Sequence, residues 1–327
     1  MTKPLRIALV GTGTIADQHY AAMQRFAGTS VVGLYNPNAR SSSLLKRQKE
    51  WQLPVYTSYD ALLGDPAVDA LAILSPTACH AEQALLAARA GKHVLIEKPI
   101  ALKSEEIDAL ALAEKEYGVC LMPAHNFVYR PVVRRAKEII DRGELGNLSY
   151  ASFRTVHFIS GQLLAGWRSS HGQAGGGAMI DSGMHLAYQS LHLMGPPQWL
   201  TAFTARRHLQ IDDEDVCQVA MQYAEGTLGY LFQSWAAHWD ETNEIRIHGD
   251  KQSLCIRDAL YVGGDKVEDD ASYESSFYHL AMAFYAYVTR GETPVSSLRD
   301  AKAALQLVQS AYHAARSRQV LQFPSVG

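Results

Sequence analysis

The chain has few cysteines, and their spacing argues against two classes of protein. Its 327 residues include four, Cys79, Cys120, Cys217 and Cys255. They form no Cys-x-x-Cys pair and no closely spaced set, so neither a disulfide-stapled fold nor a paired-cysteine metal site is expected. The sequence also has no His-Glu-x-x-His motif, and we predict no bound metal ion. These features indicate reduced thiols in a cytoplasmic protein.

Long apolar runs and an excess of charge are missing as well. No segment approaches the roughly 20 consecutive apolar residues of a membrane-spanning helix, and the chain starts almost directly with a strand-like stretch, so we expect neither a membrane protein nor a signal peptide. The formal net charge of −3 disfavours a nucleic-acid surface. With 47% hydrophobic and 19% charged residues, the composition is that of an ordinary globular chain, long enough for two domains.

The first part of the chain alternates short apolar runs with helical patterns. This alternation predicts βαβ units and therefore a parallel sheet covered on both faces. We predict a doubly wound, dinucleotide-binding Rossmann domain over residues 1–124. The predicted helices are 15–26, 40–51, 80–90 and 104–117, and the six predicted strands are 6–10, 31–35, 55–56, 70–74, 93–96 and 120–122.

Residues 125–327 have a different pattern, with longer β-like stretches and fewer helices between them. This pattern predicts an α+β domain with a large, mostly antiparallel sheet, and the last helices could pack back on the first domain. The predicted strands are 148–160, 199–208, 215–223, 227–235 and 242–257, and the predicted helices are 132–142, 179–194, 273–291 and 298–316.

A glycine-rich loop follows the first predicted strand and opens a helix. Gly11 permits a tight turn, Gly13 allows a pyrophosphate to approach the backbone, and Ala16 permits close packing of helix on strand. The helix N-terminus would face the negative charge. We predict that residues 11–16 bind a dinucleotide; the alternative is a purely structural turn. The predicted cofactor contacts in this loop are Gly11, Gly13, Thr14, Ile15 and Ala16.

The end of the second predicted strand leaves the choice of dinucleotide open. A carboxylate there usually binds the ribose of NAD, but this chain has Asn36. Asn36 can bind a hydroxyl group without repelling a phosphate, and Arg40 and Lys46 follow closely. The pattern slightly favours NADP over NAD, although Arg40 and Lys46 could equally be solvated residues of a helix.

Glu97, Lys98 and Pro99 come directly after the fifth predicted strand, at the sheet edge where open α/β folds bind ligands. A partly desolvated lysine can donate a hydrogen bond to a substrate hydroxyl and assist proton removal as hydride leaves the carbon. The alternative is a solvated lysine that ends a strand. We predict that Lys98 is catalytic, that it contacts both the substrate and the cofactor, and that Glu97 lies near the cofactor.

A third motif starts with three glycines, Gly175 to Gly177, and continues to Asp181 and His185. On a helix, residues four apart share a face, so a carboxylate there can orient an imidazole that acts as general acid or base. The alternative is a helix-capping aspartate and a core histidine. His192 lies seven residues beyond His185, but this spacing is no strong metal motif.

Together these motifs resemble the Gfo/Idh/MocA family, named for glucose-fructose oxidoreductase, inositol dehydrogenase and a rhizopine-catabolism protein. The likeness covers essentially the whole chain, with the three motifs in the family's order. It implies a Rossmann domain, a second domain whose open sheet supports dimers or tetramers, and an active site between them. It also implies that His185 exchanges the proton, Lys98 polarises the reacting oxygen and Asp181 positions the substrate.

The resemblance suggests further residues and shows two departures. Asn36 stands where the family commonly has an acid, and Tyr188 stands where an acid often follows the motif histidine by three residues. Asn126 and Trp167 could equally have structural roles. The additional candidates for the cofactor are Ser75, Thr77, His80, Asn126, Trp167 and Arg168, and those for the substrate pocket are His157 and Tyr278.

We therefore predict an NAD(P)-dependent dehydrogenase or reductase that acts on a CH–OH group of a sugar, sugar derivative or cyclic polyol. The expected assembly is a homodimer or homotetramer. Two alternatives stay open. One is a glycosidase that uses bound NAD for transient oxidation with no net redox change, and the other is a non-catalytic dinucleotide sensor.

Overall fold

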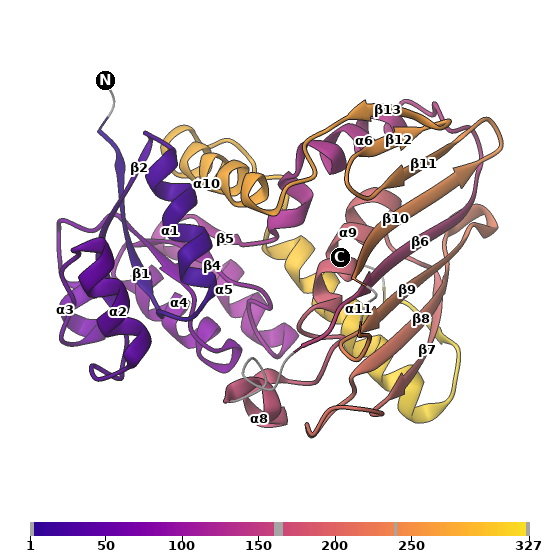
Figure 1. Cartoon of the computed structure of the whole chain (residues 1–327). Helices are drawn as coiled ribbons and strands as arrows, with labels where there is room; N and C mark the ends of the chain where they lie inside the picture. The colour runs from indigo at the N-terminus through magenta and orange to yellow at the C-terminus, as the bar shows by residue number, and fades with distance from the viewer. Residues whose placement is uncertain (1–2, 160–165, 239–240, 325–327) are drawn as a thin grey trace. The chain divides into compact units, whose positions relative to one another are not determined.

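The computed structural model describes residues 3–159, 166–238 and 241–324. The chain divides into two compact units. Unit 1 comprises Met1–Asn126 and Glu274–Leu298, and unit 2 comprises Phe127–Tyr273 and Arg299–Gly327. Within the described ranges, every helix is too short or too polar to cross a membrane. Figure 1 shows both units, with labels on many of their helices and strands.

Unit 1 is built on a five-stranded sheet in the order β2-β1-β3-β4-β5, and every neighbouring pair of strands is parallel. The inner strands are almost wholly buried, as a parallel sheet covered on both faces requires. The predicted Rossmann fold is confirmed. The strands are β1 (Leu5–Val10), β2 (Thr29–Tyr35), β3 (Ala70–Ile73), β4 (His93–Ile96) and β5 (Leu121–Pro123).

The third predicted strand, 55–56, is wrong. Val55 forms only an isolated bridge with Leu34. Leu34 N–H donates to Pro54 O and Tyr56 N–H donates to Leu34 O, both at 2.9 Å. Proline has no N–H to extend this ladder, and a helix begins at Tyr59, so the pairing ends after one residue.

The four helices predicted for this region are present, with ends within two residues of the prediction. Gly118 has a left-handed φ of 62° at the end of the helix that begins at Ser104, a conformation that favours glycine. The helical elements of unit 1 are α1 (Ile15–Arg25), α2 (Ser42–Trp51), α3 (Tyr59–Leu63), η1 (Thr77–Cys79), α4 (His80–Arg89), α5 (Ser104–Tyr117) and nearly all of α10 (Tyr273–Arg290).

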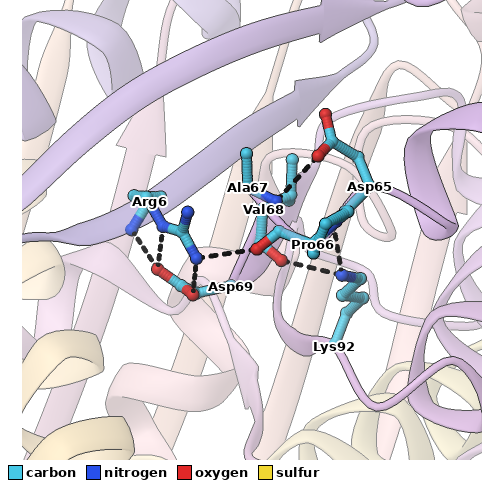
Figure 2. Close-up of polar contacts among 7 residues, drawn as sticks. All are labelled: Arg6, Asp65, Pro66, Ala67, Val68, Asp69 and Lys92. Carbon is cyan, nitrogen blue, oxygen red and sulfur yellow. Dashed lines mark hydrogen bonds and ion pairs between the residues drawn. The ribbon is translucent and has the colours of Figure 1, made fainter.

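Polar contacts tie the amino ends of β1 and β3 together (Figure 2). Arg6 donates from Nε to Asp69 Oδ2 at 2.9 Å and from a terminal nitrogen to Asp69 Oδ1 at 2.7 Å. Lys92 Nζ donates to the carbonyl oxygens of Asp65 and Val68, each at 2.8 Å. These contacts fix the sheet edge opposite to the carboxyl ends of the strands.

Unit 2 is built on a nine-stranded mixed sheet in the order β13-β12-β11-β10-β6-β9-β8-β7-β14, in which only the β6–β9 pair is parallel. The predicted α+β fold is confirmed, but the stretch 242–257 forms two strands because a turn at residues 250–252 divides it. The strands are β6 (Leu148–Val156), β7 (Trp199–Ala205), β8 (Val216–Gln222), β9 (Leu228–Ser234), β10 (Thr242–Gly249), β11 (Ser253–Ile256), β12 (Leu260–Val262), β13 (Asp265–Glu268) and β14 (Leu321–Gln322).

One face of this sheet is covered by helices, and the other carries no helix of unit 2 in the part of the chain that Figure 1 draws as ribbon. α9 packs on β6 and β9, and α6 packs on β11 to β13. On β7, Leu200 and Ala202 point into the core, whereas Trp199 and Phe203 point to the open face. The helical elements are α6 (Pro131–Asp141), η2 (Asn126–Tyr129), η3 (Trp167–Ser169), α8 (His171–Ala174), α9 (Gly183–Met194), η4 (Ala224–Gly226) and α11 (Leu298–Ser317).

Candidate active site

The glycine-rich loop at residues 11–16, the phosphate loop, contains two glycines with different structural roles. Gly11 has a φ of 100°, and a Cβ there would lie 2.7 Å from the carbonyl carbon and oxygen of Leu74, so the fold itself requires glycine. A Cβ on Gly13 would meet no atom within 4 Å. Gly13 is exposed, and the space above it is therefore open to a ligand. The loop sits at β1, between β2 and β3, where the strand order of the sheet reverses.

The N-terminus of α1 has features that favour the binding of an anion. No side chain caps the helix, and the positive end of its dipole faces the loop. Ala16 N–H and Asp17 N–H donate to the backbone oxygens of Gly13 and Thr14, at 3.0 and 3.3 Å. Asp17 is the acidic residue in this turn. Arg47 pairs with both of its oxygens, at 3.0 and 2.6 Å, and so offsets the charge that would repel a phosphate.

A cluster of small polar side chains forms where β2 ends. Asn36 Nδ2 donates to Thr12 Oγ1 at 2.8 Å, and Thr12 Oγ1 lies 3.0 Å from Ser43 Oγ. Ser43 Oγ in turn lies 2.8 Å from Ser41 Oγ. Arg40 is exposed beside this cluster, and the first turn of α2 contains no acid. The site therefore offers donors and a cation where the usual carboxylate is absent.

Glu97 is buried and directed into unit 1. Its Oε1 lies 2.8 Å from Nε2 of His19 on α1, and its Oε2 accepts the N–H of Lys98 at 2.9 Å. Burial acts to raise the pKa of Glu97, but the hydrogen bond with His19 and the charge of Lys98 outweigh it and lower the pKa. These contacts indicate that the carboxylate positions Lys98, which follows β4 and is half-buried. The predicted cofactor contact of Glu97 stays a prediction.

Lys98 has a neutral histidine close by. Burial lowers the pKa of His125 to about 3, and the charge of Lys98 adds to the shift. His125 Nδ1 lies 2.7 Å from Ser296 Oγ, and the adjacent Asn126 donates from Nδ2 to Ser276 Oγ at 2.8 Å. Both side chains are almost fully buried. Asn126 therefore supports the loop after β5, and its contact with a cofactor stays a prediction.

The cofactor candidates after β3 are Ser75, Thr77 and His80, and the imidazole of His80 is buried. His80 Nε2 lies 2.7 Å from the carbonyl oxygen of Ser75, and its Nδ1 lies 2.7 Å from that of Pro99. Burial lowers the pKa of His80, and the two carbonyl oxygens act against this shift. His80 therefore links the loops after β3 and β4, and with Thr77 it is almost fully buried, whereas Ser75 is half-buried.

In unit 2, Asp181 lies in a turn, and α9 begins only at Gly183. The predicted helix 179–194 thus starts too early, and Asp181 and His185 do not share a helical face. Asp181 Oδ2 instead accepts a 2.9 Å hydrogen bond from Nε of Arg168. The Arg168 guanidinium also lies 4.4 Å from the centre of the Trp167 ring. The predicted cofactor contacts of Arg168 and Trp167 stay predictions.

The turn before α9 is held in place by a buried carboxyl group that the sequence analysis missed. Glu214 Oε1 accepts the N–H of Met179 at 2.8 Å and the hydroxyl of Tyr312 at 2.9 Å. A Cβ on Gly177 would lie 2.0 Å from Glu214 O, and one on Gly176 would lie 2.3 Å from Tyr312 Oη. The glycines are therefore required for close approach, and the external partners explain why the helix starts late.

His185 lies on the first turn of α9 with two aromatic neighbours. Its Nδ1 is 2.7 Å from Tyr188 Oη. Its ring stacks on that of Phe127, with 4.5 Å between the ring centres and 29° between the planes. The sequence analysis predicted neither contact, although it noted that Tyr188 stands where the family often has an acid.

The two remaining substrate candidates lie in different units. His157 follows β6, and its N–H donates to Ser234 O at 3.0 Å. At the same strand ends, Trp235 Nε1 donates to Ser182 Oγ at 2.7 Å, which ties β9 to the turn that contains Asp181. Tyr278 packs near the C-terminal end of α1, with the guanidinium of Arg25 4.6 Å from its ring centre, away from the phosphate loop at the other end of that helix.

The structure thus gathers the predicted residues into two groups, one in each unit. Unit 1 brings the phosphate loop, Asn36, Arg40, His80 and Lys98 to the carboxyl edge of its parallel sheet. Unit 2 brings Arg168, Asp181 and His185 to one turn and the helix that follows it. Within the described ranges, no three His, Cys, Asp or Glu side chains are grouped to hold a metal ion.

A cavity of about 1090 Å³ in unit 2 contains none of the motif residues. It lies at the start of β6 and β7 and the end of β8, whereas His157 follows the far end of β6. The cavity and His157 therefore lie at opposite ends of β6.

The parallel sheet of unit 1 and its open glycine-rich loop are those of a dinucleotide-binding Rossmann domain. The "Oxidoreductase family, NAD-binding Rossmann fold" profile of GFO/IDH/MocA matches residues 5–125, and the "GFO/IDH/MocA C-terminal domain" profile matches residues 133–255. Together the two matches cover most of the chain. The chain belongs to the Gfo/Idh/MocA family of oxidoreductases, as the motifs suggested.

Several known proteins are similar to it. The 1,5-anhydro-D-fructose reductase of Ensifer adhaerens is 28% identical over 78% of this chain and 76% of its own. The NADP(+)-dependent scyllo-inositol 2-dehydrogenase of Bacillus subtilis is 30% identical over 65% of this chain and 60% of its own. The 2,7-anhydro-N-acetylneuraminate hydratase of Mediterraneibacter gnavus is 26% identical over 78% and 67%. Levoglucosan dehydrogenase with NADH and levoglucosan shares the fold, with a TM-score of 0.89, 22% identity and coverage of 99% and 100%.

Proposed function

We propose that this protein is an NAD(P)-dependent dehydrogenase or reductase that acts on a CH–OH group of a sugar, sugar derivative or cyclic polyol. The observation that carries the proposal is the open space at Gly13, beside the uncapped N-terminus of α1. A glycine that no internal contact requires, at the strand-order reversal of a parallel sheet, fits a dinucleotide pyrophosphate. The similar sugar and inositol enzymes support the substrate class.

The roles of the catalytic residues follow from their chemistry. When bound, the nicotinamide accepts or supplies hydride at its C4. In the oxidation direction, the alcohol O–H bond breaks and its proton forms an N–H bond on His185. Lys98 donates a hydrogen bond to the same oxygen and stabilises its developing charge. Asp181, oriented by Arg168, accepts a hydrogen bond from a neighbouring substrate hydroxyl.

The donors and the cation at the end of β2 favour NADP over NAD. A 2′-phosphate carries negative charge that a carboxylate would repel, and this loop contains none. The exposed guanidinium of Arg40 and the hydroxyl groups of Ser41 and Ser43 can meet the phosphate at the N-terminus of α2.

We also propose that two copies associate through the open face of the nine-stranded sheet. Large apolar side chains lie exposed there: Trp199 is 42% exposed, Phe203 71% and Leu228 56%. Monomeric proteins rarely leave such a group of apolar side chains in water. Pairing the same face of two copies would bury it in a homodimer or, with a second contact, a homotetramer.

The test is cofactor-reduction kinetics over a panel of sugars, inositols and glycosides, with NAD and NADP in parallel. Lys98→Ala and His185→Ala should each lower kcat by at least about 100-fold and leave dinucleotide affinity within about twofold. The matched controls are the exposed Lys115→Ala and His313→Ala. If the variants lose turnover only together with dinucleotide binding and folding, the catalytic roles are wrong.

A redox-neutral reaction is the second candidate, and the similar hydratase is the observation that favours it. Product would then form while the absorbance of the reduced nicotinamide shows no net change. A dehydrogenase forms product and reduced nicotinamide in equal amounts. Measuring both in the same reaction separates the two candidates.

A further inference from the structure

Three side chains hold His185 in place within unit 2. Phe127 stacks on the ring face, with 4.5 Å between the ring centres. Tyr188 meets the ring edge, with Oη 2.7 Å from Nδ1. Gln189 Nε2 donates to the backbone oxygen of His185 at 2.8 Å, which fixes the helix turn beneath it. The ring is therefore held on a face, at an edge and through its backbone.

The hydroxyl group of Tyr188 is itself anchored. The backbone N–H of Phe127 donates to Tyr188 Oη at 3.2 Å, and the side chain is 3% exposed. The donor comes from outside α9, so the hydroxyl position does not depend on the helix alone. Tyr188 thus connects the start of unit 2 to the imidazole edge.

A buried cation fixes Phe127 in turn. The guanidinium of Arg130 lies 4.1 Å from the centre of the Phe127 ring, and Arg130 is 5% exposed. It donates to Gln189 Oε1 at 3.1 Å, so it joins the stacked ring to the residue that holds the His185 backbone. Burial lowers the pKa of Arg130 to about 10, so it keeps its charge at neutral pH.

We propose that Tyr188 is a positioning residue for the proton transfer of His185, an inference that rests on the proposed function. A phenol hydroxyl can donate to Nδ1 or accept from it, whereas a carboxylate can only accept. The hydroxyl group lies 2.7 Å from Nδ1, so it can take either role in this hydrogen bond. It can therefore hold the ring in both protonation states without adding a charge.

The test compares Tyr188→Phe with Tyr223→Phe, a second tyrosine that is 3% exposed in unit 2. Tyr188→Phe keeps the buried ring and removes only the hydroxyl. We expect kcat to fall by at least about tenfold, while the KM of the alcohol, the dinucleotide Kd and the melting temperature stay close to wild type. Tyr223→Phe should change none of them.

A second measurement needs no substrate. In ¹⁵N-histidine NMR spectra, with the His185 signals assigned by their loss in His185→Asn, Tyr188→Phe should shift the Nδ1 resonance and Tyr223→Phe should not. An unchanged Nδ1 resonance, an unchanged kcat, or a parallel loss of kcat, Kd and stability each overturns the inference. A wild-type protein without dinucleotide-linked turnover on the whole panel overturns the proposed function instead, and the NMR result then decides the contact by itself.

Discussion

Arg168 Nε donates a 2.9 Å hydrogen bond to Asp181 Oδ2, so the motif aspartate has a cationic neighbour from its own unit. The pair is only partly exposed, at 29% for the arginine side chain and 13% for the aspartate. Asp181 is therefore oriented before any substrate arrives.

Arg168→Gln should weaken substrate binding more than cofactor binding. A hydrogen bond to a charged group contributes about 1.5–3 kcal/mol when buried and less with partial exposure, so we expect the alcohol KM to rise about tenfold. Steady-state kinetics and dinucleotide titration measure the two effects separately. The control is Arg135→Gln, which breaks a pair of the same 2.9 Å length on the surface of α6. A larger change in dinucleotide Kd than in KM would contradict this expectation and would favour the cofactor contact of Arg168 that the sequence predicts.

Gly13→Val should separate binding from folding. The side chain enters open space, so the melting temperature should stay within a few degrees, but it fills the position through which a pyrophosphate approaches the backbone. We expect the dinucleotide Kd to rise at least about 100-fold. Gly11→Ala should instead unfold at lower temperature, because its φ of 100° and the 2.7 Å contacts with Leu74 exclude a Cβ. Calorimetry and cofactor fluorescence distinguish the pair; retained binding in Gly13→Val would remove the main support for the proposed function.

Local sequence patterns predicted most of the helices and strands, because a buried parallel strand or a capped helix can be identified from a few adjacent residues. The prediction failed where a distant partner decides the geometry. Val55 looks like strand, but Pro54 limits its pairing. Asp181 was predicted to be helical, but Glu214 holds the preceding turn through its contact with Met179, 35 positions away in the chain.

The residues of the candidate site divide in the same way, into those that local patterns predict and those whose geometry depends on distant contacts. Gly11, Gly13 and Lys98 could be found because each follows a strand of a recognisable unit. Tyr188 could be noticed only as a departure from the expected acid, and its task became visible with the 2.7 Å contact to His185. Nothing local in the sequence marks Glu214 as a support of the motif turn.

Arg40→Ala should change the preference between the two dinucleotides. If the exposed guanidinium meets a 2′-phosphate, its loss removes a charge-assisted hydrogen bond. We expect the Kd for NADP to rise about tenfold and that for NAD to change less than about twofold. The exposed Lys49→Ala on α2 is the control for a general loss of positive charge. Equal losses for both dinucleotides, or a wild-type preference for NAD, would contradict the role of Arg40.

Glu214→Gln should alter how stability depends on pH. Burial raises the pKa of Glu214, against the hydrogen bonds from Met179 and Tyr312. A carboxyl group with a raised pKa in the folded state contributes stability that is full below its unfolded pKa, about 4.3, and is lost as pH rises through the folded value. The melting temperature of Glu214→Gln minus that of wild type should therefore increase by about 2 °C or more as the pH is raised from acidic to mildly alkaline.

The control for this comparison is Glu116→Gln, an exposed glutamate on α5. Its melting temperature should follow that of wild type at every pH. A Glu214→Gln difference that shrinks as pH rises would mean that the carboxylate, and not the neutral acid, is the form that the folded unit prefers.

Phe203→Glu should break the proposed association of two copies. Phe203 is 71% exposed on β7, and the paired residues Gln218 and Phe232 extend the same face across β8 and β9. Burying two symmetry-related carboxylates without partners is costly, so we expect dimer affinity to fall at least about 100-fold.

Leu112→Glu on α5 of unit 1, at a 67% exposed leucine, is the matched control. Light scattering would show a multiple of 36.0 kDa for wild type and Leu112→Glu, and 36.0 kDa for Phe203→Glu. A monomeric wild type, or a mass unchanged by Phe203→Glu, would mean that the open face is not the interface.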